Sequence, residues 1–226
     1  MIGCIIQARM GSNRLPGKVL KLVDEENNVL DYVINQLKHC KLLEKIVVAT
    51  TTLHEDDLIA KFCQKKNIDC FRGESDDVLD RHYQCAKKYS FSTIIRMPSD
   101  KPLLDPSFVD RIISVYKNNS YDYVTTFHPL SFPIGTEVEV FSFSTLEKIW
   151  NNASSPFDRE HVTTFIYNDQ NSFKIFNVLN TTDESQYSWS VDTQEDLELV
   201  RKIISKISSR PILIKDILTL FNNEKI

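Results

Sequence analysis

Short apolar runs alternate with amphipathic segments along the first half of the chain. Apolar runs of this length are typical of buried strands, and apolar residues spaced three or four positions apart are typical of helices. Strands are predicted over residues 2–7, 46–50, 69–72, 93–97 and 121–127. Helices are predicted around residues 30–37, after residue 55, around residues 78–86 and over residues 106–116. The alternation predicts an α/β fold, with a mostly parallel sheet sandwiched by helices in a Rossmann-like arrangement.

The pattern changes after residue 128. A segment with two prolines and a glycine is followed by an alternating, strand-like stretch. The later elements are predicted as strands at 137–141, 173–179 and 189–192, and as helices at 144–150, 159–167 and 197–207. We expect one domain over residues 1–226, in which residues 128–180 form a small inserted arm that acts as a lid or a dimerisation element.

Two predicted strands lead directly into chemically distinctive loops. The first strand runs into a basic loop over residues 9–18, and the fourth runs into Asp100. In open parallel sheets, ligands bind beyond the carboxyl ends of the strands. Both loops should therefore open on the same edge of the sheet.

The loop over residues 7–18 carries three cations, two glycines and a serine. Glycines let backbone N–H groups approach an anion, and Arg or Lys side chains neutralise phosphate. The spacing fits neither the P-loop pattern, because Val19 follows Lys18, nor GxGxxG. A solvated turn with incidental charges is the other interpretation, but so many cations directly after a buried strand favour phosphate binding.

The composition narrows the class of protein. The net charge is -4, so the chain as a whole has no basic surface for nucleic acid. Five cysteines without a CxxC pair indicate reduced thiols and a cytoplasmic location rather than a disulfide framework or a zinc site. The N-terminal apolar run is too short for a signal peptide, and no stretch is long enough to span a membrane.

The segment "IIQARMGSNRLPGKVL" resembles the N-terminal signature of the cytidylyltransferase family. This family includes acylneuraminate and keto-deoxy-octulosonate cytidylyltransferases and the F-type proteins of spore coat polysaccharide biosynthesis. Further segments resemble the spore coat branch, in the expected order: "RGESDDVLDRHYQCAKKY", "IIRMPSDKPLLDP", "FPIGTEVEVFS", "REHVT" and "WSVDTQEDLELV". The resemblance covers most of the chain.

The resemblance implies a nucleotide-diphospho-sugar-transferase-like fold and the transfer of CMP from CTP to a small-molecule acceptor, with release of pyrophosphate. It implies that Asp100 and Asp192 hold Mg²⁺, which binds one or two carboxylates together with phosphate oxygens. The matching nucleotide-binding positions are Ala8, Arg9, Gly11, Ser12, Arg14 and Lys18. Of the expected site residues, Arg9, Arg14, Lys18 and Asp100 are the candidates for catalysis. The resemblance also implies a homodimer.

Other positions have two interpretations each. Thr50 and Thr51 could hydrogen-bond the base or ribose, or simply end a strand. Arg81 could reach the nucleotide or the acceptor, although the acids around it need only the dipole at a helix start to explain them. Glu137 and His161 could bind the acceptor, or belong to a solvated strand face and be a structural histidine, respectively.

Three other functions stay open at this point. A nucleotidyltransferase could use another nucleoside triphosphate or a non-sugar phospho or phosphono acceptor. A glycosyltransferase with a similar sheet would need a DxD-type metal motif, and the stretch Ser99-Asp100-Lys101 does not supply one. A protein that only binds a nucleotide would release no pyrophosphate.

Overall fold

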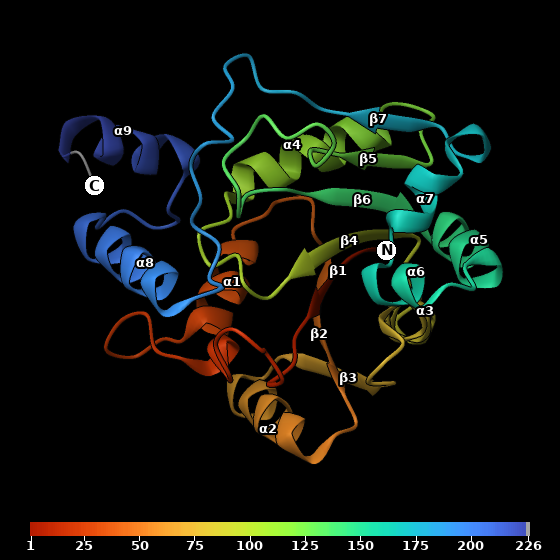
Figure 1. The fold of residues 1–226 in the computed structure, drawn as a ribbon, viewed down its shortest axis with the longest axis horizontal. Helices are drawn as coiled ribbons and strands as arrows, with labels where there is room; N and C mark the ends of the chain where they lie inside the picture. The colour runs from red at the N-terminus through yellow and green to blue at the C-terminus, as the bar shows by residue number, and fades with distance from the viewer. Residues whose placement is uncertain (225–226) are drawn as a thin grey trace.

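The computed structural model describes residues 1–224 and contains one seven-stranded sheet in the order β3-β2-β1-β4-β6-β5-β7 (Figure 1). The strands are β1 (Ile2–Gln7), β2 (Lys45–Thr51), β3 (Asp69–Gly73), β4 (Thr93–Pro98), β5 (Tyr123–Thr125), β6 (Glu139–Ser142) and β7 (Ile175–Asn177). The α-helices are α1 (Val29–Leu37), α2 (Asp57–Lys66), α3 (Val78–Lys88), α4 (Pro106–Lys117), α5 (Phe143–Asn152), α6 (Pro156–His161), α7 (Thr164–Asn168), α8 (Gln194–Lys206) and α9 (Ile214–Glu224).

The sheet is mostly parallel, as predicted. Strands β3, β2, β1 and β4 run parallel to one another, and β5 runs parallel to β7. Strand β6 runs antiparallel to both β4 and β5. The chain leaves β1 for β2 on one side, whereas β4 lies on the other side of β1. The carboxyl ends of β1 and β4 therefore meet where the strand order reverses, which is the usual ligand position in such sheets.

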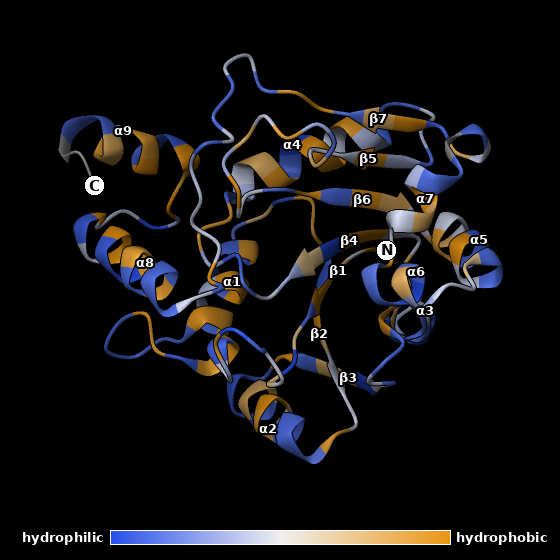
Figure 2. Ribbon diagram, viewed as in Figure 1, coloured by the Kyte–Doolittle hydropathy of each residue, from blue (hydrophilic) through white to orange (hydrophobic). Residues whose placement is uncertain are grey.

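Helices cover both faces of the sheet because successive strand residues point to opposite sides. On β1, Cys4 and Ile6 face a core that includes α1, α2 and α4, and Ile5 faces a second core that includes α3 and α5. Figure 2 shows the matching pattern, with apolar central strands and helices that are apolar on one side. The predicted α/β architecture is confirmed.

A third core lies at one side of the sheet, where α8 and α9 pack together (Figure 1). Trp189 and Val191 are fully buried in it, against residues of α8. The pattern analysis did not predict α9. Within residues 1–224, no helix combines the length and apolar character needed to cross a membrane.

Three predictions about the second half need correction or refinement. Residues 189–192 do not form a strand, because their backbone bonds to loop residues: Trp189 N–H donates to Ile134 and Val191 N–H donates to Asp100. The helix predicted at 159–167 is divided into α6 and α7 by Val162, whose φ is 64°. Segment 128–180 contributes β6 to the middle of the sheet, and its role as a lid or dimer arm stays a prediction.

Candidate active site

The loop after β1 folds back on itself to place its cations at the edge of the sheet. The Met10 carbonyl accepts hydrogen bonds from the N–H groups of Ser12, at 2.8 Å, and Gly17, at 3.0 Å. Gly17 has a φ of 67°, a left-handed conformation that favours glycine and lets the chain turn into the short helix at Lys18–Leu20. The Met10 N–H donates to Asp56, at 2.6 Å, which ties the loop to the start of α2.

Lys18 joins the two predicted metal ligands. Its Nζ lies 2.9 Å from Asp100 Oδ2, 2.9 Å from Asp192 Oδ1 and 2.8 Å from the Val191 carbonyl oxygen. Arg14 also reaches Asp192 Oδ1, at 2.8 Å. Two carboxylates and two cations from segments more than 80 residues apart therefore converge beyond the ends of β1 and β4.

Neither aspartate is used as a helix cap. Asp100 follows β4 and does not cap a helix, since Asp105 caps α4. Asp192 precedes α8, but the N-cap of that helix is Thr193, in a capping box with Asp196. A cap role therefore does not explain either carboxylate at the cavity. The hydrogen bond from Val191 N–H to the Asp100 carbonyl, at 2.8 Å, holds the two segments side by side.

The donor set at this point fits a magnesium ion. Two carboxylates already share one ammonium group, so their oxygens face a common point. Mg²⁺ typically takes one or two carboxylates and completes its octahedron with water and substrate phosphates. The described residues contain no cluster of three or more His, Cys, Asp or Glu for a metal. Asp100 and Asp192 would therefore hold the ion together with phosphate oxygens.

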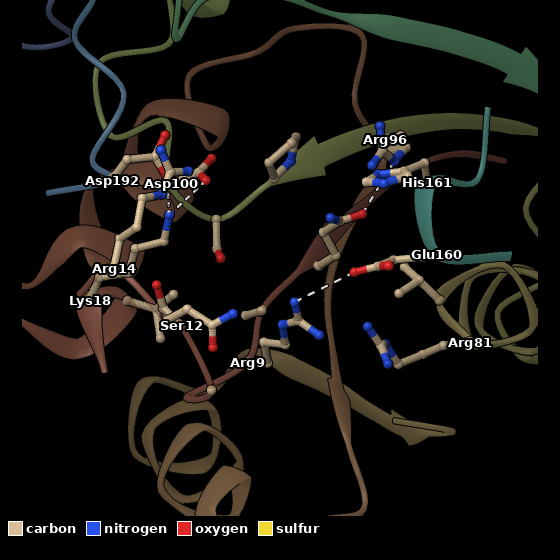
Figure 3. Close-up of a pocket in the computed structure, with 18 residues that line it drawn as sticks. Arg9, Ser12, Arg14, Lys18, Arg81, Arg96, Asp100, Glu160, His161 and Asp192 are labelled. Atoms are coloured by element: carbon tan, nitrogen blue, oxygen red, sulfur yellow. Dashed lines mark hydrogen bonds and ion pairs between the residues drawn. The ribbon is translucent and has the colours of Figure 1, made fainter. Parts of the chain in front are cut away.

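A cavity of about 400 Å³ opens from these charges. Figure 3 shows its two groups: Asp100, Asp192, Arg14 and Lys18 at one end, and Arg9, Glu160 and Arg81 towards the other. Its lining includes the expected residues Ala8, Arg9, Gly11, Ser12, Arg14, Lys18, Arg81, Asp100, His161 and Asp192. The cavity thus has cations towards both ends, which suits an extended polyanion.

Two arginines flank the end away from the aspartates. Arg9 is half exposed and lies 3.9 Å from Glu160 of α6. Arg81 is buried and donates to the carbonyl groups of Glu74 and Ser75. Burial, and then the nearby charge of Arg9, lowers the pKa of Arg81. Arg81 lines this first cavity, so it lies with the basic loop of residues 9–18, where phosphate binding is expected (the phosphate loop), rather than with Glu137.

A second cavity of about 410 Å³ adjoins the first. Six residues line both cavities: Gln7, Arg96, Pro98, Asp100, His161 and Asp192. Glu137 lies in the second cavity and is almost fully buried, with its Oε2 2.8 Å from Lys101 Nζ and 2.9 Å from the Gly135 N–H. The alternative interpretation of Glu137 as part of a solvated strand face is therefore wrong.

Arg96 is a cavity residue that the sequence analysis missed. It pairs with Glu139 across the β4–β6 register, at 2.6 Å, and donates to Gln7, at 3.2 Å. Glu139 also accepts a hydrogen bond from Thr163, at 2.6 Å. Burial raises the pKa of Glu139, but the charge of Arg96 and the hydrogen bonds outweigh it, so the pKa is lowered. An arginine inside an otherwise apolar strand is the sequence signal that could have indicated such a buried partner.

Thr50 and Thr51 are not brought to the two cavities. Both are fully buried at the end of β2. Thr51 donates to Asp56, the residue that holds the Met10 N–H. This contact makes Thr51 a support for the phosphate loop, which agrees with the structural interpretation of the pair.

A model of the cytidylyltransferase family matches residues 3–224. The chain belongs to the cytidylyltransferase family. The spore coat polysaccharide biosynthesis protein SpsF of Bacillus subtilis is 32% identical over 96% of this chain and 92% of its own length. A protein of Methanocaldococcus jannaschii is 43% identical over 76% of this chain and 69% of its own. The solved structure of a cytidylyltransferase from Leptospira borgpetersenii superposes with a TM-score of 0.94, at 31% identity, covering 98% of this chain and 93% of that one.

These similarities confirm the family, the fold and the general activity. This cytidylyltransferase has the nucleotidyltransferase fold that the resemblance implied, and it is an enzyme of nucleotidyl transfer. The match to the family spans both the phosphate loop and the two aspartates, so the segments that form the first cavity belong to the shared framework.

Proposed function

We propose that this enzyme binds CTP and Mg²⁺ in the first cavity and transfers CMP to a sugar, sugar-acid or phospho acceptor, with release of pyrophosphate, in the synthesis of cell-surface polysaccharide precursors. The observation that carries the proposal is the position of Lys18, which is part of the phosphate loop and contacts both Asp100 and Asp192. A ligand with phosphates and a bridging cation would use both the cations of the loop and the two carboxylates.

The chain's own residues have distinct tasks in this reaction. Arg9, Arg14 and Lys18 would neutralise the triphosphate and the departing pyrophosphate. An ion held by Asp100 and Asp192 would supply charge neutralisation at the α-phosphate. Nucleotidyl transfer needs little covalent work from the protein, so positioning and charge neutralisation supply most of the rate.

The acceptor would lie in the second cavity, which meets the first at the aspartates. Glu137 and His161 line that cavity, so they are our candidates for acceptor contacts. Arg81 lies on the nucleotide side, so we assign it to CTP instead. An in-line displacement requires the acceptor oxygen to approach the α-phosphorus from the side opposite the leaving pyrophosphate, so the acceptor would reach the nucleotide through the junction of the two cavities.

Pyrophosphate release tests the proposal. The protein would be incubated with each of CTP, UTP, ATP and GTP, across a panel of sugars, sugar acids and phospho or phosphono acceptors, with Mg²⁺ or with EDTA. We expect release with CTP and Mg²⁺ and a loss of at least about 100-fold in Asp100→Asn. Preference for another nucleotide would support the alternative nucleotidyltransferase. Release of a nucleoside diphosphate from an added nucleotide sugar, without pyrophosphate release from any triphosphate, would support a glycosyltransferase.

A further inference from the structure

The junction of the two cavities contains few groups that could accept a proton. Six residues line both cavities. Of their side chains, only those of Asp100, Asp192 and His161 can accept a proton at neutral pH. Asp100 and Asp192 are already bonded to Lys18, and Asp192 also to Arg14. Carboxylates that neutralise cations are weakened as bases. Of these three proton acceptors, His161 is therefore the one that forms no ion pair with Lys18 or Arg14.

We propose that His161 is the general base of the reaction, an assignment that rests on the proposed function. The role applies to an acceptor that attacks through a hydroxyl group. Its oxygen would form a bond to the α-phosphorus while the bond from that phosphorus to the bridging oxygen of pyrophosphate breaks. The hydroxyl proton would pass to a ring nitrogen of His161. Because His161 is exposed, the imidazolium would then return its proton to solvent.

The position of His161 is fixed by the helix that carries it. Arg159, two residues earlier on α6, donates to Asp77 at the start of α3, at 2.9 Å, and to the Trp150 carbonyl, at 2.9 Å. The imidazole packs against the ring of Phe157, with 4.4 Å between the ring centroids. His161 is thus carried by a short, anchored helix and lines the junction of the two cavities, as Arg96 also does (Figure 3).

The charged and titratable groups around His161 come from every element that borders the cavities. They are Arg159 and Glu160 on α6, Arg96 on β4, Glu139 on β6, Tyr167 on α7, Arg81 on α3, Lys18 on the short helix Lys18–Leu20, and Arg9, Arg14, Asp100, Lys101, His128, Glu137 and Asp192 on the loops. Arg96 and Lys101 are each paired with a buried carboxylate. Each of these two cations is therefore balanced by a partner of its own.

The test is the pH dependence of kcat for three histidine variants. His161→Gln removes the proposed base, His128→Gln removes the histidine that lines the second cavity alone, and His39→Gln is an exposed control outside both cavities. We expect His161→Gln to lose about 100-fold to 1000-fold in kcat, to lose the acidic limb of its pH profile, and to regain activity with added imidazole. The other two variants should keep the limb.

Several outcomes would overturn the assignment. An acidic limb that persists in His161→Gln, a kcat within about threefold of the unmodified enzyme, or a loss confined to KM for the acceptor would show that His161 is not the base. Equal unfolding temperatures and equal CTP affinities exclude misfolding as the cause of a loss. Turnover by the unmodified enzyme separates this failure from failure of the proposed function, which would appear as no pyrophosphate release with any acceptor and would end the assignment as well.

Discussion

Replacing Lys18 by methionine tests whether the lysine competes with a metal ion for Asp100 and Asp192 when no nucleotide is bound. In the structure, the Lys18 ammonium lies between Asp100 and Asp192, where we propose that Mg²⁺ binds. An ion that enters alone must displace the ammonium, but an ion that arrives with a triphosphate offers Lys18 new phosphate partners. We therefore expect the metal alone to bind the unmodified enzyme weakly and the Lys18→Met variant more tightly.

The size of the effect follows from the contacts that the ammonium would give up. Lys18 Nζ makes three hydrogen bonds of 2.8 to 2.9 Å. At a net value of about 0.5–1.5 kcal/mol each, their loss costs roughly 1.5–4.5 kcal/mol. The two carboxylates are 26% and 29% exposed, so solvent screening favours the lower half of that range. This corresponds to an increase of roughly 10-fold to 100-fold in metal affinity for Lys18→Met.

Mn²⁺ titrations followed by electron paramagnetic resonance measure this affinity directly, with and without CTP. Lys21→Met is the matched control, since Lys21 lies three residues further along the chain and outside the cavity. CTP should tighten Mn²⁺ binding strongly in the unmodified enzyme and much less in Lys18→Met, whose turnover should fall. The same Mn²⁺ affinity in Lys18→Met and in the unmodified enzyme, measured without nucleotide, would refute this reasoning.

Three further changes have clear directions. Arg14→Ala should raise KM for CTP about 10-fold in steady-state assays with little change in unfolding temperature, because this exposed side chain would contact phosphate; an unchanged KM would contradict this. Glu139→Gln should lower the free energy of unfolding by about 3–5 kcal/mol in urea titrations, because it leaves Arg96 without its buried partner; a loss under 1 kcal/mol would contradict this. Burial, and then the charge of Arg96, lowers the pKa of His82 to about 3, so the folded enzyme keeps this histidine neutral. As the pH falls, the unfolded chain binds a proton at His82 before the folded enzyme does. The free energy of unfolding should therefore fall by up to about 1.4 kcal/mol per pH unit between about pH 6 and pH 4. His82→Gln should flatten this slope in urea titrations, and an unchanged slope would show that the histidine is charged in the folded enzyme.

Local patterns were enough for most of the sheet and for the phosphate loop. In the first half of the chain, apolar runs predict the buried strands, and the edge on which a parallel strand ends follows from the alternation with helices. The loop at residues 9–18 and Asp100 could thus be placed on one edge without coordinates. The homodimer and the cytoplasmic location stay predictions.

Long-range contacts account for what the patterns missed. Residues 189–192 are apolar enough for a strand, but their backbone partners are the loop residues Ile134 and Asp100, which no local pattern reveals. Glu137 and Glu139 alternate with valines as a solvated strand face would, yet each is buried because a cation from another segment, Lys101 or Arg96, pairs with it. Pairing across the fold decides whether such a charge is buried.

The most direct test of the central claim is a crystal structure of the enzyme with CTP and Mg²⁺. We predict that the triphosphate lies along Arg9, Arg14 and Lys18, that the ion bridges a phosphate oxygen to Asp100 and Asp192, and that the Lys18 ammonium has turned from the carboxylates to the phosphates. CTP bound elsewhere, or an ion that contacts neither aspartate, would contradict the account.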